Sequence, residues 1–168
     1  MVVRVAEVAA KRGARRIVGR ERELAALLDT LTGSGPFVCW IHGIAGIGKT
    51  ALVTAFAERA RETGSAVVVL DCGTTEPTEP GLLAALATAT GAVSASVDAI
   101  VDRLAGWPQA VIVLDRYEVM RLMDTWLRQV LVPALPATAR LVVAGREPPV
   151  AAWLASPVLD AVRLVPLD

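Results

Sequence analysis

The stretch CWIHGIAGIGKTALV, residues 39–53, changes its character twice along its length. An apolar run ends at His42, a loop with three glycines follows, and an apolar pattern with helical spacing begins after Lys49 and Thr50. A short apolar run that ends in glycine is typical of a buried strand, and apolar residues three and four apart are typical of a helix. The stretch therefore predicts a strand, a glycine-rich loop and a helix, in that order.

The loop GIAGIGKT, residues 43–50, fits the phosphate-binding pattern G-x-x-x-x-G-K-[ST] at every position. Glycines allow the main chain to turn tightly and to approach phosphate oxygens without an intervening Cβ atom. Successive amide groups then form an anion-binding nest, and the helix that follows directs its positive end towards that nest. We expect nucleotide phosphates to be bound by Gly43, Ile44, Ala45, Gly46, Ile47, Gly48, Lys49, Thr50 and Ala51.

Two side chains at the end of the loop suit a nucleotide with a bound metal ion. The Lys49 ammonium is a compact, mobile charge for the β- and γ-phosphates, whereas a guanidinium would be broader and more rigid. The chain has only two lysines among its 17 basic residues, so a lysine at this position stands out. The Thr50 hydroxyl is an oxygen ligand that suits Mg²⁺.

The composition indicates one compact domain. The chain has 168 residues, 54% of them hydrophobic and 20% charged, and its formal net charge is zero. Zero net charge argues against a surface that coats nucleic acid, and no apolar run approaches the roughly 18 residues of a membrane span. Cys39 and Cys72 are expected to be buried free thiols in a reducing, cytoplasmic compartment. A single histidine, His42, with two separated cysteines does not make a zinc site.

Strand-like and helix-like segments alternate along the chain. Continuous apolar runs predict strands at 37–41, 66–71, 110–115, 139–145 and 161–165. Helical spacing predicts helices at 19–31, 49–64, 79–90, 94–107, 119–135 and 148–156. This alternation predicts a three-layer α/β domain with a mainly parallel sheet, because parallel strands are covered on both faces. We expect the core to span residues 17–168 and residues 1–16 to form a basic N-terminal extension or helix.

Asp115 ends the apolar run AVIVLD, residues 110–115. The carboxyl end of a buried parallel strand lies in the crevice where such sheets bind ligands, so Asp115 is expected to act with Thr50 at a Mg²⁺ ion, as a Walker-B acid does. Alone, the same residue could equally cap the helix that follows. The intact phosphate-binding loop favours the metal role.

Two further residues follow strands that end at the same crevice. Glu118 could orient an attacking water molecule, or it could occupy the first turn of a helix, where acidic residues are favourable. The Arg146 guanidinium could reach a γ-phosphate, or it could be solvated or paired with Glu147. With Lys49 and Asp115, these two residues complete the expected catalytic set.

Four segments together resemble a known family. IVGRERELAALL (17–28), WIHGIAGIGKTALV (40–53), VIVLDRYE (111–118) and LVVAGREPP (141–149) resemble the ATPase core of STAND-type signalling NTPases. The resemblance extends to actinobacterial regulators that carry a LuxR-type DNA-binding domain. It implies a P-loop NTPase fold of the ASCE type with a five-stranded sheet of order 5-1-4-3-2, and ATP or ADP with Mg²⁺ as ligands.

The resemblance also assigns roles to single residues. It implies that Val18, Gly19 and Arg20 lie beside the adenine, that Asp115 is the Walker-B acid and that Arg146 reads the γ-phosphate. Many members have a second acid directly after the Walker-B aspartate, where this chain has Arg116. Glu118 would then substitute for it, and we expect slow hydrolysis.

The whole-protein role that the resemblance implies is an ATP-dependent switch in signal transduction and transcription. The family's polypeptide continues into a lid and further domains, so residues 17–168 are expected to be a nucleotide-binding core that lacks them. The full-length parent would form nucleotide-dependent homo-oligomers and contact DNA only through a domain absent here, with no membrane partner. The absence of an N-K-x-D guanine motif favours ATP over GTP.

Two other functions stay open at this point. Small-molecule kinases also use a phosphate-binding loop at this chain length, but they usually begin with the strand that precedes it, whereas a helix-like segment comes first here. A scaffold that binds nucleotide without hydrolysing it is compatible with Arg116 after Asp115.

Overall fold

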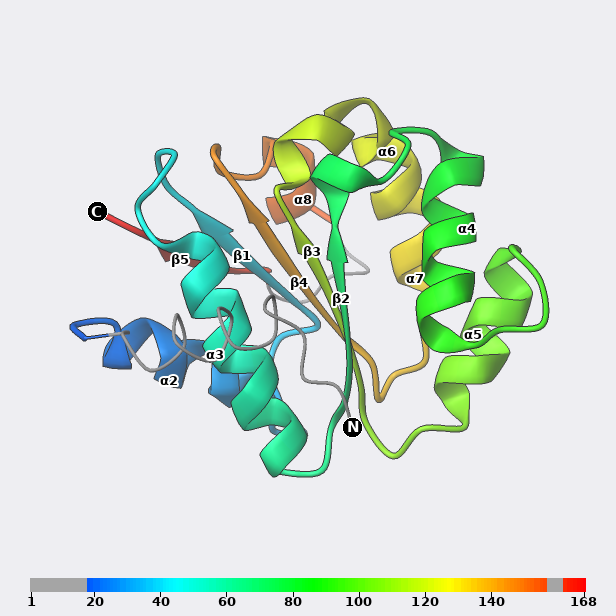
Figure 1. Cartoon of the computed structure of the whole chain (residues 1–168), viewed down its shortest axis with the longest axis horizontal. Coiled ribbons are helices and arrows are strands. Elements are labelled where there is room, and N and C mark those ends of the chain that lie inside the picture. Colours follow the sequence, from blue (N-terminus) through cyan, green and yellow to red (C-terminus); the bar gives the residue numbers. More distant parts are fainter. Residues whose placement is uncertain (1–17, 157–161) are drawn as a thin grey trace, which may run out of the picture.

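Five parallel strands form a single sheet at the centre of the molecule (Figure 1). The computed structural model describes residues 18–156 and 162–168. The strands are β1 (Val38–His42), β2 (Ala66–Asp71), β3 (Ala110–Asp115), β4 (Arg140–Gly145) and β5 (Val162–Pro166). Their order across the sheet is β2-β3-β4-β1-β5, and every neighbouring pair is parallel. The expected order 5-1-4-3-2 is the same sequence of strands counted from the other edge, and the fold prediction is confirmed.

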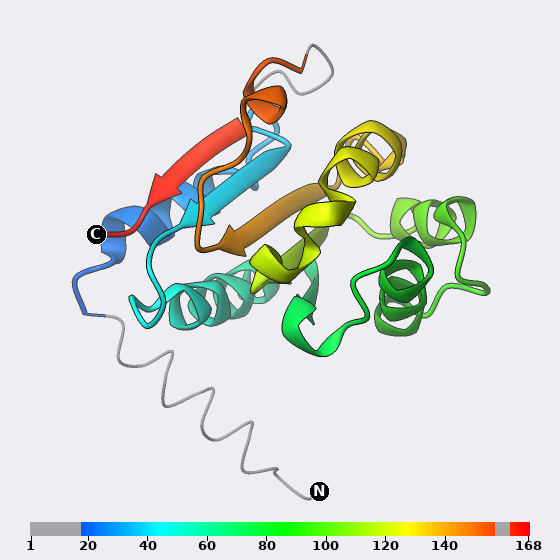
Figure 2. The same cartoon turned by 90° about the horizontal axis from the view of Figure 1, so that it is seen from above.

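Helices cover both faces of this sheet (Figures 1 and 2). On one face lie α2 (Glu21–Asp29) and α3 (Lys49–Glu62), and the opposite face is covered by α4 (Glu79–Thr90) and α5 (Val97–Ala105). Successive residues of a strand point to opposite faces, so β3 contributes to two separate cores. Val111 and Val113 pack against α2 and α3, while Ile112 and Leu114 pack on the other side. The three-layer arrangement follows directly from these continuous apolar strands.

The two helices between β2 and β3 begin at hydroxyl caps. The Thr78 side chain accepts from the Gly81 amide at 3.1 Å, and the Ser96 side chain accepts from the Ala99 amide at 3.2 Å. Each bond satisfies one of the amide groups that a helix leaves unpaired at its start. The predicted pair at 79–90 and 94–107 is therefore present, the second as a shorter helix.

The single helix predicted at 119–135 is wrong. The segment instead divides into a 3-10 helix η2 (Tyr117–Met123), a short α6 (Asp124–Trp126), a π-helical turn η3 (Leu127–Leu131) and α7 (Val132–Ala134). In η2 the residues at spacing three, Tyr117, Met120 and Met123, are all buried, which suits a helix of three residues per turn. Pro133 lacks the amide that would continue regular α-helical bonding, and the wider π turn directly precedes it.

The last predicted helix, at 148–156, forms only as the short α8 (Ala151–Leu154). The prediction for residues 1–16 lies outside the described residues. No helix within residues 18–156 and 162–168 combines the length and the apolar character needed to cross a bilayer.

Two polar side chains, one buried and one part-buried, join the lower end of the sheet to the end of α2. Arg140 is only 4% exposed, and its Nε donates to the Thr30 carbonyl at 2.8 Å. The Gln109 amide donates to the Leu31 carbonyl at 2.6 Å. Because the last carbonyls of a helix have no partner within it, a cation and an amide there stabilise its end. These contacts fix α2, and hence the chain that leads into β1.

Cys39 and Cys72 are free, buried thiols, as the sequence predicts. Burial is the main cause that raises the pKa of each thiol from 9.0 to about 12. In the unfolded chain both thiols ionise near pH 9, whereas in the folded protein they stay neutral. Their contribution to stability is therefore complete below pH 9 and is lost as the pH rises towards 12.

We predict that raising the pH from 9 to 10 lowers the free energy of unfolding by about 2 kcal/mol through these two thiols. Urea unfolding at the two pH values measures the change. The double variant Cys39→Ala/Cys72→Ala serves as the control and should lose most of this dependence. An equal dependence in the variant would contradict the assignment, because the buried Tyr117, whose pKa is raised from 10.0, contributes only a small part of the change between pH 9 and 10.

Candidate functional site

The carboxyl ends of the parallel strands lie along one edge of the sheet, at the top of Figure 1, together with the glycine loop between β1 and α3. A cavity of about 270 Å³ opens at this edge. It is lined by Ala45, Gly46, Gly48, Lys49, Thr50, Ala51, Asp115, Arg116, Glu118 and Arg146. All four residues of the expected catalytic set thus meet at one cavity, although Lys49 is 66 positions away from Asp115 in the sequence.

The glycine loop has the tight geometry that its sequence predicts. Gly46 and Gly48 have φ values of 79° and 105°, which glycine adopts without strain. Residues 44–48 donate only one main-chain hydrogen bond within the described part of the chain, a long one of 3.4 Å from Ile47 to the Ile44 carbonyl. The other amides of the loop are therefore free to bind an anion.

Gly43 is required for a different reason, which is close approach. A Cβ atom at this position would lie 2.8 Å from the Leu167 carbonyl oxygen and 3.1 Å from the Ile47 side chain. The Leu167 amide also donates to the His42 carbonyl at 2.8 Å, so the segment after β5 runs against the start of the loop. Gly43, Ile44 and Ile47 do not themselves line the cavity.

The Lys49 ammonium bends back onto the loop that precedes it. Its Nζ donates to the Gly43 carbonyl at 2.6 Å and to the Ile44 carbonyl at 2.7 Å. These are charge-assisted hydrogen bonds, and they hold the positive charge at the mouth of the loop. Lys49 is thus placed beside the free amides, where a polyphosphate could exchange for the two carbonyls.

Thr50 and Asp115 are in direct contact. The Thr50 hydroxyl donates to Asp115 Oδ2 at 2.8 Å, and the Arg116 amide donates to Asp115 Oδ1 at 2.9 Å. Asp115 is 6% exposed, and the helix after it begins without a side-chain cap, so Asp115 does not act as one. A hydroxyl and a carboxylate side by side are oxygen ligands of the kind that Mg²⁺ prefers. The residues present therefore fit such an ion.

Glu118 and Arg146 form an ion pair across the same cavity. Arg146 Nε lies 3.2 Å from Glu118 Oε1, and the Arg146 side chain is 61% exposed. The second oxygen, Oε2, is buried without a hydrogen-bond partner among the described residues and lies near Gly145. Glu147 pairs instead with Arg121 at 2.9 Å, so the Glu147–Arg146 pairing considered from the sequence does not form.

Of the residues expected beside the adenine, Arg20 is the one with a defined contact near the loop. It pairs with Glu23 at 2.9 Å and donates to the Asp168 carbonyl at 2.9 Å. Gly19 has a φ of 86° and Val18 is exposed. None of Val18, Gly19 and Arg20 lines the cavity, but Arg20 reaches the same terminal segment that packs on Gly43.

Comparison with known proteins decides the family. The sequence model described as "AAA ATPase domain" matches residues 16–144. The chain belongs to this AAA ATPase domain family. A sequence search of curated proteins finds no match.

Solved structures share the fold of this AAA ATPase domain. The Aeropyrum pernix ORC1 protein in complex with DNA has a TM-score of 0.63 and 19% identity over 92% of this chain. Drosophila ORC bound to DNA has a TM-score of 0.64 and 21% identity over 96% of it. The replication initiator DnaA bound to AMPPCP and single-stranded DNA has a TM-score of 0.58 and 17% identity over 93%. The chain spans 44%, 46% and 49% of the lengths of those three chains.

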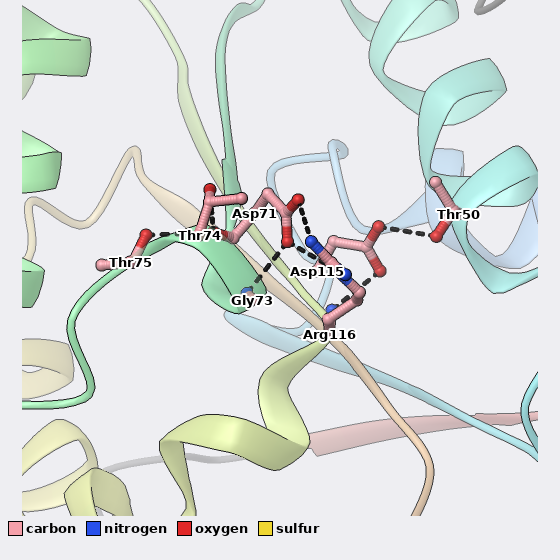
Figure 3. A network of polar contacts seen from close by, with 7 residues as sticks. All are labelled: Thr50, Asp71, Gly73, Thr74, Thr75, Asp115 and Arg116. Carbon is pink, nitrogen blue, oxygen red and sulfur yellow. Dashed lines mark hydrogen bonds and ion pairs between the residues drawn. The ribbon is translucent and has the colours of Figure 1, made fainter.

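One charged residue beside the site of the AAA ATPase domain was not singled out from the sequence, namely Asp71. It ends β2 as Asp115 ends β3, and the two residues are register partners on adjacent strands. The Arg116 guanidinium binds the Asp71 carboxylate, with Nε donating to Oδ1 at 2.6 Å (Figure 3). This hydrogen bond is the main cause that lowers the pKa of Asp71. The matching runs AVVVLD and AVIVLD contain a signal for this pair, because parallel strands in register bring their last residues together.

A second unpredicted feature of the AAA ATPase domain supports the chain that carries Arg146. The Trp40 indole donates to the Glu147 carbonyl at 3.0 Å and packs edge-on against Tyr117 and Trp153. Asp124 accepts from the Tyr117 hydroxyl at 3.0 Å and from Trp153 Nε1 at 2.8 Å. Each of these part-buried polar groups has a hydrogen-bond partner, and together they hold the loop after β4 in place.

We predict that Gly43→Ala lowers the free energy of unfolding by about 1 to 3 kcal/mol, because the added methyl group overlaps the Leu167 carbonyl. The matched control is Gly33→Ala, where a Cβ atom meets nothing within 4 Å, and its free energy should change by less than about 0.5 kcal/mol. Urea denaturation measures both. Equal stability of the two variants would show that the terminal segment does not pack on the loop.

Proposed function

We propose that the cavity at the strand ends binds ATP and ADP together with Mg²⁺, and that the chain is the switch domain of a cytoplasmic signalling protein that regulates transcription. The observation that carries the proposal is the convergence of Lys49, Thr50, Asp115, Glu118 and Arg146 on one cavity beside free loop amides. The AAA ATPase family assignment supports a nucleotide ligand, and the four sequence segments that resemble STAND regulators support the switch role.

Binding of the phosphates would use groups that the structure already holds in place. The amides of residues 44–48 with the start of α3 form a positive surface. Lys49 would exchange the carbonyls of Gly43 and Ile44 for phosphate oxygens, which carry full charge and therefore form the stronger hydrogen bonds.

Thr50 and Asp115 would hold the metal ion. When bound, Mg²⁺ neutralises charge on the β- and γ-phosphates and orients them. Among the described residues no cluster of three or more His, Cys, Asp or Glu side chains could bind a metal alone. Magnesium sites of one or two protein oxygens completed by phosphate are common, so binding of the ion should depend on the nucleotide.

Glu118 and Arg146 would distinguish ATP from ADP. At rest the two side chains neutralise each other, and Arg146 is exposed enough to move. A γ-phosphate would attract the guanidinium and so release the Glu118 carboxylate, which could then orient a water molecule for in-line attack. ADP lacks the γ-phosphate and would leave the pair closed. Arg116 in place of a second acid makes slow hydrolysis the expected result.

Oligomer formation in the full-length parent would follow from the same difference between the two nucleotide states. A nucleotide-dependent homo-oligomer is therefore part of the proposal, with DNA contacted only through another domain. The DNA in the ORC and DnaA structures belongs to those proteins, and the zero net charge of this chain does not favour direct DNA binding.

Transfer of labelled phosphate from ATP to a small-molecule acceptor would instead support the kinase alternative.

We predict that Lys49→Ala weakens binding of Mg²⁺-ATP roughly tenfold to a hundredfold, since it removes charge-assisted hydrogen bonds. Isothermal titration calorimetry with ATP, ADP and GTP measures the affinity. The control Arg59→Ala removes a positive charge from the same helix, where Arg59 pairs with the exposed Glu62, and its affinity should equal that of the wild type. Unchanged binding in Lys49→Ala would contradict the proposed site.

We predict that Arg146→Ala reduces the affinity for ATP several-fold and leaves the affinity for ADP unchanged, because only ATP offers a γ-phosphate. Glu118→Gln should keep ATP binding but abolish phosphate release in a turnover assay. If Arg146→Ala affected both nucleotides equally, Arg146 would not read the γ-phosphate. If Glu118→Gln hydrolysed ATP at the wild-type rate, Glu118 would not orient the attacking water molecule.

A further inference from the structure

Two carboxylates lie next to each other where the sheet ends. Asp71 and Asp115 are register partners on β2 and β3, so their side chains leave the sheet on the same face. Like charges directly opposite each other on neighbouring strands destabilise a sheet. The pair is nevertheless part of the structure, because a positive group lies between the two residues.

Arg116 binds both carboxylates with different parts of the same residue (Figure 3). Its main-chain amide donates to Asp115 Oδ1 at 2.9 Å, and its guanidinium donates to both oxygens of Asp71. Arg116 has left-handed backbone angles, φ 55° and ψ 41°, which turn the chain from the end of β3 into η2. This conformation is uncommon for a residue other than glycine, and Arg116 is the one such residue in the described part of the chain.

The chain after β2 is shaped to receive the guanidinium. The Arg116 side chain lies against Gly73, where any Cβ atom would overlap it. The Gly73 amide donates to Asp71 Oδ1 at 2.9 Å, and the Thr74 and Thr75 hydroxyls donate to the Asp71 carbonyl at 3.1 and 3.0 Å. Asp71 is therefore held from several sides, although it is partly exposed and does not line the cavity.

We propose that Asp71 is a positioning residue for the Mg²⁺ end of the nucleotide site and acts through Arg116. Asp71 holds the Arg116 side chain, the Arg116 main chain then holds Asp115 Oδ1, and Oδ2 stays directed at the Thr50 hydroxyl. The inference rests on the proposed function and names the residues that orient its metal ligand. It also gives Arg116 a role, which is to connect Asp71 at the end of β2 with Asp115 at the end of β3 and not to contact phosphate.

A positioning role for Asp71 and simple electrostatics predict opposite changes in nucleotide affinity when the Asp71 carboxylate is removed. Asp71→Asn takes a negative charge away from the neighbourhood of a polyanion site, so Coulomb interactions would strengthen nucleotide binding. It would also free a guanidinium that could turn towards the phosphates. A positioning role instead predicts weaker binding, and only when the metal takes part.

The experiment compares ATP binding by isothermal titration calorimetry in Mg²⁺ and in EDTA. We expect Asp71→Asn to lower the affinity in Mg²⁺ by about tenfold, the usual effect of removing a group that orients a metal ligand. The affinity in EDTA should not fall. The matched control, Glu62→Gln, removes an exposed carboxylate that is likewise paired with an arginine, and it should match the wild type in both conditions.

Three further variants separate a positioning role of Arg116 from direct contact with phosphate. The charge-swapped double variant Asp71→Arg/Arg116→Glu should recover most of the Mg²⁺-dependent affinity that Arg116→Glu alone loses. If Arg116 were itself a phosphate ligand, both variants would lose affinity in EDTA as well, and the inference would be overturned. Arg116→Lys keeps the charge but not the two-pronged geometry, so it should show a smaller loss in Mg²⁺ only.

The wild type separates this inference from the proposed function. If the wild-type chain bound no nucleotide in either condition, the proposed function would fail. If the wild type bound ATP and Asp71→Asn bound it equally well in Mg²⁺, only the role of Asp71 would be rejected. An equal loss in Mg²⁺ and in EDTA would also reject that role, since it would indicate a general structural effect.

Discussion

The hydrogen bond between the Thr50 hydroxyl and the Asp115 carboxylate joins the two halves of the site. It connects the first turn of α3 with the end of β3, although β4 lies between β1 and β3 in the sheet. Because the strands are parallel, their carboxyl ends and the loops after them lie at the same edge. The loop, the metal ligands and the Glu118–Arg146 pair therefore share one cavity.

Three groups of side-chain contacts hold the elements around the site in place. Arg116 ties Asp115 to Asp71 across two strands, and the Trp40 cluster fixes the loop that carries Arg146. Arg140 anchors the far end of α2 against the sheet. Lys49 is bound by two main-chain carbonyls and Arg146 lies in an exposed ion pair, so a charged ligand could attract both groups without disturbing these contacts.

Local patterns in the sequence were sufficient for the strands, for most helices and for the glycine loop, because burial and glycine geometry are properties of short segments. The helix predicted at 119–135 failed because the burial of Tyr117, Met120 and Met123 at spacing three and the proline at 133 override helical spacing. Asp71 and the Trp40 cluster were missed for another reason. Their roles depend on which strands become neighbours, and one strand read alone does not contain that information.

The central claim is that free main-chain amides between residues 44 and 48, with the Lys49 ammonium, bind a polyphosphate. The most direct measurement is the change of amide ¹H–¹⁵N chemical shifts when ADP is added with Mg²⁺. The account predicts the largest changes at residues 44–50, with smaller ones at Asp115 and Arg116. Saturation with ADP that left the amides of residues 44–50 unchanged, or that shifted only residues on the opposite end of the sheet, would contradict it.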